Sequence, residues 1–119
     1  MTEWKKKLAM AENNQTKRAL GMLGLAMKAG KVVIGTEQVI AYLQKGKLSL
    51  VLVSGNASEG TKNKIRFKCE FYKTTLTEVE VETDELGRLL GKTYAPAVVG
   101  ITDENFSKTI GKILSGENA

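Results

Sequence analysis

The sequence predicts a single α/β domain, a three-layer α/β/α sandwich in which helices cover both faces of a mixed four-stranded sheet. Helix-like and strand-like segments alternate along the chain, and such alternation is typical of helices packed on both sides of one sheet. The chain has 119 residues, of which 42% are hydrophobic and 26% are charged. This length suits one domain, and this composition suits a packed core rather than a disordered chain.

Three segments of different character divide the chain. Residues 1–15 are polar, carry lysines and show little periodicity, which predicts a flexible N-terminal arm. The folded domain is expected over residues 16–115. Residues 116–119 are expected to form a short tail.

The first half of the domain is expected to contain helix, strand, helix and strand in that order. Residues 16–29 carry apolar side chains at helical spacing and are followed by a glycine, which commonly ends a helix. Residues 31–34 are short and β-branched, which favours a strand, and Thr36 can cap the helix that follows. Residues 48–53 are an almost continuous apolar run, typical of a strand covered on both faces, and should form the centre of the sheet.

The second half begins with a helix and an edge strand. Residues 61–72 predict a helix in which Ile65, Cys69 and Tyr72 share one face, so Cys69 should lie in the core. Residues 76–81 alternate strictly, with glutamates on one side and valines on the other. This pattern predicts a half-exposed edge strand that its glutamates protect from aggregation.

The chain closes with a short helix, a strand and a last helix. Thr83 can cap the short helix, and Gly91 ends it. Residues 97–101 form another apolar strand. Asp103 opens the last helix, whose apolar residues recur at helical spacing and predict a well-defined inner face.

Composition excludes several classes of protein. The chain has no histidine and one cysteine. The absence of histidine excludes His-containing catalytic triads and His-ligated metal sites, and a single cysteine cannot form an intramolecular disulfide. These absences remove a large part of enzyme chemistry, and we expect no metal and no cofactor.

The hydropathy pattern predicts a cytoplasmic protein. The longest uninterrupted apolar run is Val39–Leu43, whereas a membrane span needs about 20 residues. The basic first residues are not followed by the apolar segment of a signal peptide. The single cysteine also suits a reducing compartment.

Charge is distributed unevenly within a net charge of +5. Residues 1–75 carry 14 basic and 5 acidic side chains, whereas residues 76–119 carry 4 basic and 8 acidic ones. A basic region of this kind can face phosphate groups, which favours a nucleic-acid partner. The alternative is ordinary solvated surface charge.

Two loops that follow strands are candidate ligand sites. At Gly35–Gln38 a strand turns into a helix, so unpaired backbone N–H groups can face a phosphate while Glu37 and Gln38 meet base edges. The alternative is a plain helix start, with Glu37 near the helix dipole and Gln38 in solvent. Residues 54–60 lack the spacing of a phosphate loop, which favours a helix-entry loop capped by Ser58 over nucleotide binding. If the strands are parallel there, Asn56 lies beside the first turn.

A third candidate is the apolar loop at residues 94–98, which leads into a strand. Simple burial is one interpretation. The other is an exposed apolar ledge for an unstacked base, which bulged or single-stranded RNA supplies and a duplex does not.

Several strings, taken in order, resemble the kink-turn-binding ribosomal protein superfamily, and most closely its bacterial YlxQ-like branch. They are residues 23–31, 34–38, 50–58, 85–88 and 91–92. The resemblance extends from about Thr16 to Ile113, nearly the whole domain.

The resemblance implies binding to kink-turn RNA, a sharply bent duplex whose bulge is flanked by sheared G·A pairs. It implies that Gly35 lets the turn approach the RNA backbone, that Glu37 and Gln38 face the G·A edges, and that Lys28 and Lys31 meet phosphate. The loop before the last strand would pack on an extruded bulge nucleotide. The complete set of RNA-binding candidates is Lys28, Lys31, Gly35, Thr36, Glu37, Gln38, Asn56, Ala95, Pro96, Ala97 and Val98.

The turn also departs from the family pattern. The archaeal motif reads Gly-Ala-Asn-Glu with a lysine three residues after the glutamate, and the matching residues here are Gly35, Thr36, Glu37, Gln38 and Ala41. Glu37 adds a negative charge near phosphate, and Ala41 removes a cation. These departures bear on affinity and on the preferred RNA variant rather than on the fold.

The sequence therefore predicts a non-catalytic, ribosomal or ribosome-associated protein that binds kink-turn or similar bent, bulged RNA. Two other interpretations stay open. One is an RNA-presenting accessory subunit of an RNA-modifying enzyme such as a methyltransferase. The other is a small nucleotide-binding regulator that uses residues 54–60.

Overall fold

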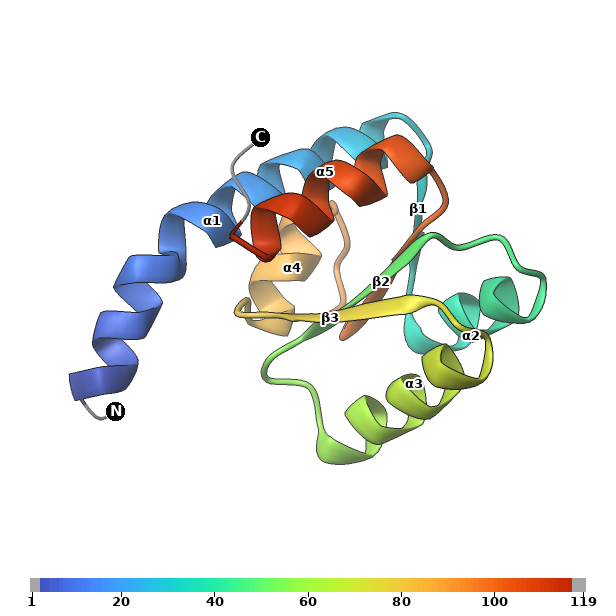
Figure 1. The fold of residues 1–119 in the computed structure, drawn as a ribbon, viewed down its shortest axis with the longest axis horizontal. Helices are drawn as coiled ribbons and strands as arrows, with labels where there is room; N and C mark the ends of the chain where they lie inside the picture. The colour runs from blue at the N-terminus through green and yellow to red at the C-terminus, as the bar shows by residue number, and fades with distance from the viewer. Residues whose placement is uncertain (1–2, 117–119) are drawn as a thin grey trace.

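Five helices and four strands alternate along residues 3–116, the part of the chain that the computed structural model describes (Figure 1). Side chains are described from Gln15 onward. The elements are α1 (Glu3–Lys28), β1 (Val32–Ile34), α2 (Thr36–Gln44), β2 (Leu50–Ser54), α3 (Glu59–Phe71), β3 (Thr75–Val79), α4 (Thr83–Leu89), β4 (Val98–Ile101) and α5 (Glu104–Leu114).

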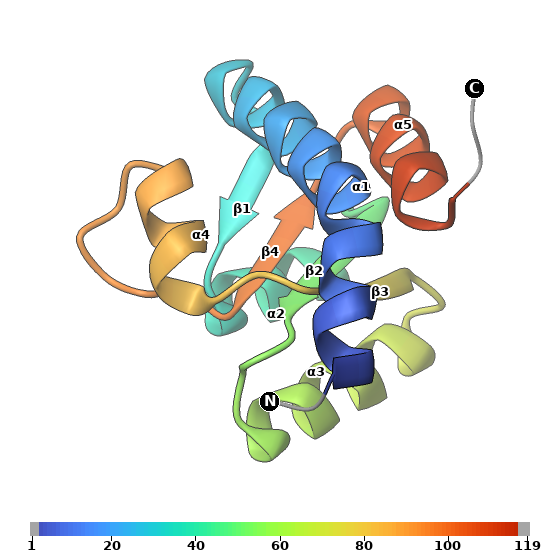
Figure 2. The same ribbon diagram turned by 90° about the vertical axis from the view of Figure 1, so that its left-hand side faces the viewer.

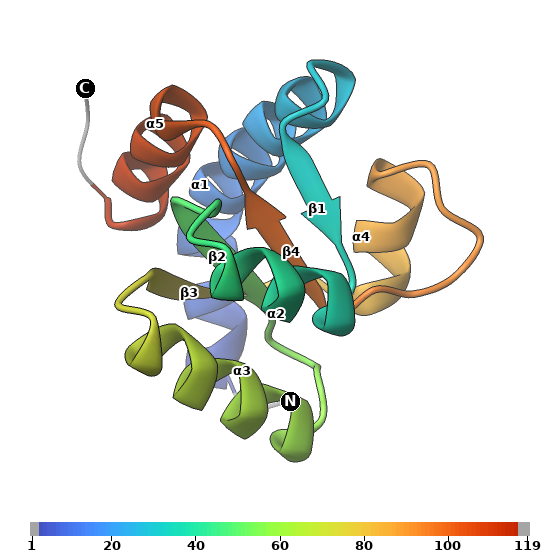
Figure 3. The same ribbon diagram turned by 90° about the vertical axis from the view of Figure 1, so that its right-hand side faces the viewer.

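The four strands form one mixed sheet in the order β1-β4-β2-β3, which confirms the predicted sheet (Figure 3). β4 runs antiparallel to both of its neighbours, and β2 and β3 are parallel. Consequently β1, β2 and β3 all end at one end of the sheet, where β4 begins. We call this the α2 end, because α2 starts there, and we call the opposite end, where β4 leads into α5, the α5 end.

Helices cover both faces of the sheet, as predicted for three layers (Figure 2). On one face, α1, α4 and α5 enclose a core that includes Leu23, Leu52 and Ile110. On the other face, α2 and α3 enclose a second core that includes Val51 and Ile65. Alternate side chains of β2 therefore enter different cores, which explains why a strand with apolar residues on both sides is stable there.

The two strands singled out from the sequence behave as predicted. Every residue of β2 is buried, and β2 occupies an inner position in the sheet. β3 forms an edge, where Glu78 and Glu80 are exposed while Val79 and Val81 are buried. Charged side chains on the outer side of an edge strand hinder pairing with another chain.

Helix α1 is longer than the sequence analysis predicts. It begins at Glu3, so the expected helix start at residue 16 is wrong: residues 3–15 are also helical, and they extend away from the rest of the domain (Figure 1). This segment has no glycine or proline and is rich in residues with good helix propensity, so nothing stops the helix before residue 16. Residues 1–2 of the predicted arm and 117–119 of the predicted tail lie outside the described residues.

Two of the predicted helix caps are confirmed and two are wrong. Ser58 Oγ accepts a hydrogen bond from Thr61 N–H (3.2 Å), and Asp103 Oδ1 accepts one from Phe106 N–H (3.0 Å). Thr36 and Thr83 are instead the first residues of α2 and α4, and neither helix has a side-chain cap at its N-cap position. Thr36 is already helical because the chain turns at Gly35.

Candidate functional site

Three loops meet at the α2 end of the sheet. The Gly35 N–H donates to the Val98 carbonyl (2.9 Å), which joins the start of α2 to the start of β4. The Ser54 N–H donates to the Ala97 carbonyl (2.8 Å), which joins the end of β2 to the loop before β4. Because β4 lies between β1 and β2, it brings together the turn Gly35–Gln38, the loop after β2 and the loop before β4. The sequence analysis predicted that the first two lie side by side if their strands run in the same direction, and β1 and β2 do so on either side of β4.

Gly35 sets the direction in which α2 leaves the sheet. Its backbone has φ 101° and ψ 147°, close to a region that glycine adopts almost exclusively. The first helical hydrogen bond runs from Val39 N–H to the Gly35 carbonyl (2.9 Å). The N–H groups of Thr36, Glu37 and Gln38 therefore precede the helical ladder, and no side chain at the N-cap position accepts from them. These donors and the positive end of the helix dipole are suited to an anion.

The exposed side chains of this turn are Glu37 and Gln38, whereas Thr36 is half-buried. Glu37 Oε1 forms an ion pair with Lys64 Nζ at 2.9 Å. The side chains are 81% and 50% exposed, so the pair contributes at most about 1 kcal/mol to stability. Lys64 thus neutralises the carboxylate that departs from the family pattern, and it brings a cation to a turn where Ala41 supplies none.

Lys64 is a site residue that the sequence analysis missed. It lies in the predicted helix 61–72, but its contact with Glu37 depends on how α3 packs beside α2. Helical spacing identifies the buried face of α3 and does not show which exposed side chain will meet a neighbouring helix.

Asn56 lies in the loop after β2 and links that loop to α4. Its Oδ1 accepts a hydrogen bond from Thr83 N–H (3.1 Å). Ser54 Oγ can donate either to the same oxygen (2.7 Å) or to the Val81 carbonyl. Asn56 is itself exposed, and its NH₂ group makes no hydrogen bond within residues 15–116, whose side chains the structure describes. The side-chain oxygen of Asn56 therefore stabilises the fold, whereas its NH₂ group is available to a ligand.

The loop before β4 is only partly exposed. Ala95 is exposed and Ala97 is half-buried, but Pro96 is buried and Val98 is 0% exposed. The expectation of an exposed ledge is therefore wrong for Pro96 and Val98. Val98 is already a strand residue, paired with Val53 on β2 and packed in the core under α2 and α3.

The exposed surface of this loop is completed by Tyr94, which stands beside Ala95. A Cβ at Gly87 would overlap the Tyr94 carbonyl oxygen, so α4 packs directly against the loop backbone. This close approach fixes Tyr94 and Ala95 relative to the rest of the domain.

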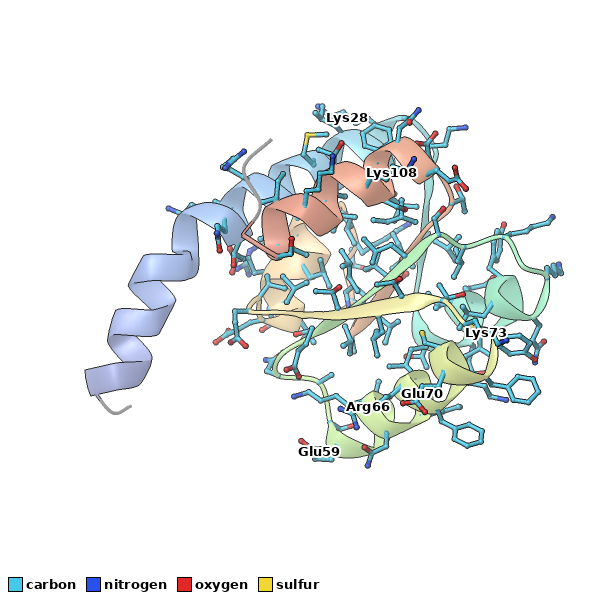
Figure 4. The ribbon with its side chains drawn as sticks, viewed as in Figure 1. Lys28, Glu59, Arg66, Glu70, Lys73 and Lys108 are labelled. Atoms are coloured by element: carbon cyan, nitrogen blue, oxygen red, sulfur yellow. The ribbon has the colours of Figure 1, made fainter. Side chains whose placement is uncertain are left out.

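Lys28 and Lys31 do not join the three loops. The Lys31 carbonyl accepts from Thr102 N–H (3.0 Å), which places Lys31 at the α5 end of the sheet. Lys28 lies in the last turn of α1, on the side of the molecule that carries α5 (Figure 4). The extended chain from Lys31 to Gly35, which includes β1, separates Lys31 from the turn by about 13 Å.

Residues 54–60 form a helix-entry loop, as the sequence analysis favoured. Ser58 caps α3 and Asn56 caps the start of α4, so Ser58 Oγ and Asn56 Oδ1 both accept hydrogen bonds within the protein.

Among the described side chains, no group of three or more acidic or cysteine residues could hold a metal ion. Within residues 3–116, no helix has the length and apolar character needed to cross a membrane.

Comparison with known proteins identifies the family of the chain. The family model described as ribosomal protein L7Ae/L30e/S12e/Gadd45 matches residues 17–111. The chain belongs to this family. The predicted membership is thereby confirmed, and the chain is a non-catalytic protein like the ribosomal and RNA-binding proteins that it matches.

Individual relatives agree with the predicted branch of the family. The RNA-binding protein YlxQ of Enterococcus faecium is 36% identical over 107 residues, which cover 90% of this chain and 100% of that protein. The RNA-binding protein YlxQ of Bacillus subtilis is 39% identical over 93 residues, covering 78% of this chain and 91% of that one. A solved structure of a protein with unknown function from Bacillus halodurans C superimposes with a TM-score of 0.75 at 34% identity, over 82% of this chain and 96% of that chain.

Proposed function

We propose that this chain is an RNA-binding protein that recognises kink-turn or similar bent, bulged RNA, and that it acts in the cytoplasm as a component or partner of the ribosome. Two relatives carry the name RNA-binding protein, and the family name is that of ribosomal proteins. The observation that carries the proposal is the meeting of three loops at the α2 end, beside a helix start without a side-chain cap.

The start of α2 contacts the RNA most closely. Its free N–H groups donate to phosphate oxygens, as helix N-termini commonly do. Gln38 presents one acceptor and two donors and can contact a base edge at two points. Glu37, with Lys64 beside it, accepts from amino groups on the G·A edges while its charge stays compensated.

The loop before β4 provides the apolar part of the site. Ala95 and the exposed part of Ala97 pack on the extruded bulge nucleotide, and the ring of Tyr94 extends this surface. Pro96 and Val98 contribute indirectly, because their burial holds the loop in position. Asn56 lies in the neighbouring loop, where its NH₂ group can donate to RNA.

Lys28 and Lys31 contact the backbone of a stem rather than the bend. Lys31 lies about 13 Å from Gly35 along β1, and Lys28 ends the preceding helix α1, so an RNA helix that leaves the bend in that direction reaches them. Contacts of this kind add affinity that depends on salt and not on sequence.

The mechanism is selection of a shape. A kink-turn RNA exchanges between extended and bent states, and a protein that fits only the bent state shifts this equilibrium by its difference in affinity for the two. Recognition therefore requires no chemical step.

Fluorescence energy transfer between dyes on the two ends of a kink-turn RNA tests this function. Addition of the protein should bring the ends together, whereas an RNA of equal length without the bulge should show no change. If the protein leaves the two RNA ends apart and co-purifies with a methyltransferase, the proposal is contradicted. The chain is then better described as an accessory subunit of that enzyme. Heat released on titration with nucleotides at micromolar concentration would favour the nucleotide-binding alternative.

A further inference from the structure

Two phenylalanine side chains are exposed to solvent on the outer side of α3. Phe67 is 66% exposed and Phe71 is 68% exposed, although the buried face of the same helix is supplied by Ile65 and Cys69. Residues four apart lie on successive turns of one side of a helix, so the two rings are neighbours. Single exposed apolar residues are common, but adjacent exposed aromatic rings indicate a contact surface.

The two rings continue a line that begins at the proposed RNA site. Lys64 precedes Phe67 by three residues and Phe71 by seven, a spacing that places all three on one side of α3. Lys64 Nζ is 2.9 Å from Glu37 Oε1 at the start of α2. We call Lys64, Phe67 and Phe71 the α3 stripe. It leads from the α2 end along the helix for about 10 Å.

The surroundings of the α3 stripe are mainly basic. Along α3 and just after it, Arg66, Lys68 and Lys73 add three positive charges against the carboxylate of Glu70, while Glu37 offsets the charge of Lys64. Arg66 Nη1 donates to Asn63 Oδ1 (2.9 Å) rather than to a carboxylate, so its charge is not neutralised there. A surface that combines exposed aromatic rings with excess positive charge complements unpaired nucleotides, which present both flat bases and phosphates.

We propose that the α3 stripe binds an unpaired stretch of the RNA that continues past the bend, with bases stacked on Phe67 and Phe71. This inference rests on the proposed function, because it extends the same RNA along α3. Lys64 contacts the phosphate at the junction through the ammonium donors that its ion pair with Glu37 leaves free.

The dimensions of the α3 stripe set the length of the segment. The two phenylalanines are separated by about 6 Å along the helix axis, and successive bases of a stacked strand by about 3.4 Å. The stripe therefore accommodates about three nucleotides. Phenylalanine offers no hydrogen-bonding group to a base, so the contact tolerates any base sequence. The ring of Phe71 is held by an edge contact with Tyr72, whose ring centre is 4.9 Å away.

Binding of extended and blunt RNAs tests the inference. The RNAs are one kink-turn with blunt ends and the same kink-turn with about three unpaired nucleotides at each strand end in turn. Wild-type protein should bind one of the extended RNAs about tenfold more tightly than the blunt RNA. The double variant F67A/F71A should lose this gain and keep its affinity for the blunt RNA. Thermal melting checks that each variant is folded.

Matched variants separate stacking from other effects. F67Y/F71Y retains both aromatic rings and should keep the gain, whereas F67L/F71L retains only apolar volume and should lose it. L25A/L89A removes two other exposed apolar side chains, on α1 and α4, and should leave the affinities for the extended and blunt RNAs unchanged. If the extensions add no affinity, or if F67A/F71A binds them as well as wild type does, the inference is wrong.

The outcomes also distinguish this inference from the proposed function. Equal binding of kink-turn and unbulged RNA, together with loss of single-stranded RNA binding in F67A/F71A, would overturn the proposed function and leave the α3 stripe standing. A change from dimer to monomer in F67A/F71A on sedimentation, with RNA binding unaffected, would make the stripe a protein interface and overturn the inference.

Discussion

The two ends of the sheet differ in how they satisfy the backbone at helix starts. At the α5 end, Asp103 caps α5. At the α2 end, Ser58 caps α3 and Asn56 accepts from the first N–H of α4, but a glycine without a side chain precedes α2. Of the four helices that follow a strand, α3, α4 and α5 thus have starts completed by the protein's own side chains, and α2 keeps its donors for an external acceptor. This contrast locates the binding site more narrowly than the topology alone, because the topology places α2, α3 and α4 at the same end.

The largest effect is expected from Gly35→Ala. A Cβ at φ 101° is strained whatever space surrounds it, so the free energy of unfolding should fall by about 1–3 kcal/mol, measured by denaturant titration. Affinity for kink-turn RNA should fall as well, because the start of α2 would move.

Gly30→Asn is the matched change at the α5 end. Gly30 has φ 74°, a left-handed conformation that asparagine tolerates, so both stability and binding should stay close to wild type. If Gly35→Ala is as harmless as Gly30→Asn, the special geometry at the α2 end has no role.

Gln38→Ala should affect binding without affecting stability. Loss of a two-point base contact should weaken binding to kink-turn RNA by about 1–3 kcal/mol, measured by titration. Gln38 is exposed, so the melting temperature should not change. Gln44→Ala alters an equally exposed glutamine at the other end of the same helix and should leave both quantities unchanged. Equal losses for the two variants would show that α2 binds by its whole length rather than by its start.

Asn56→Ala tests whether the hydrogen bond from Thr83 N–H to Asn56 stabilises the start of α4. Removal of Oδ1 leaves Thr83 N–H without its partner, and the free energy of unfolding should fall by about 1–2 kcal/mol. Asn63→Ala removes an exposed side-chain pair on α3 and should change stability by less than about 0.5 kcal/mol. Calorimetric melting of both variants gives the comparison, and similar melting temperatures would contradict the structural role of Asn56.

The smallest effects are expected from the lysines, which sharpen the contrast between the two ends. Lys31→Ala at the α5 end and Lys64→Ala at the α2 end should each reduce the slope of log affinity against log salt by roughly 0.7–0.9. Lys31→Ala should weaken binding to straight and bent RNA equally, whereas Lys64→Ala should weaken binding to bent RNA more than binding to straight RNA. A Lys31 variant with the wild-type slope would show that the RNA stem does not extend along β1.

Local sequence patterns predict most of the fold. Alternation and periodicity identify every helix and strand, because burial on one or both faces imposes those patterns on residues 48–53, 61–72 and 76–81. Helical spacing also identifies Cys69 as a core residue, and the structure confirms this, since Cys69 is 2% exposed; this burial raises the pKa of its thiol to about 11. The start of α1 was missed because lack of apolar periodicity in residues 3–15 does not prevent a helix when good helix formers dominate.

The candidate site is less accessible to sequence reasoning. Thr36 matches a capping pattern, yet the conformation of Gly35 moves the helix start by one residue. Val98 looks like part of an apolar loop, and only its pairing with β2 shows that it is buried. Lys64 is positioned by packing of α3 beside α2, a long-range contact that no local pattern encodes.

Titration of wild-type protein against one kink-turn RNA and its unbulged control, at two salt concentrations, tests the proposed function most directly. The account predicts a clear preference for the kink-turn that persists at the higher salt concentration, while both affinities fall as lysine–phosphate contacts are screened. Equal affinities for the two RNAs at both salt concentrations would show that the start of α2 does not recognise a bend, and would contradict the account.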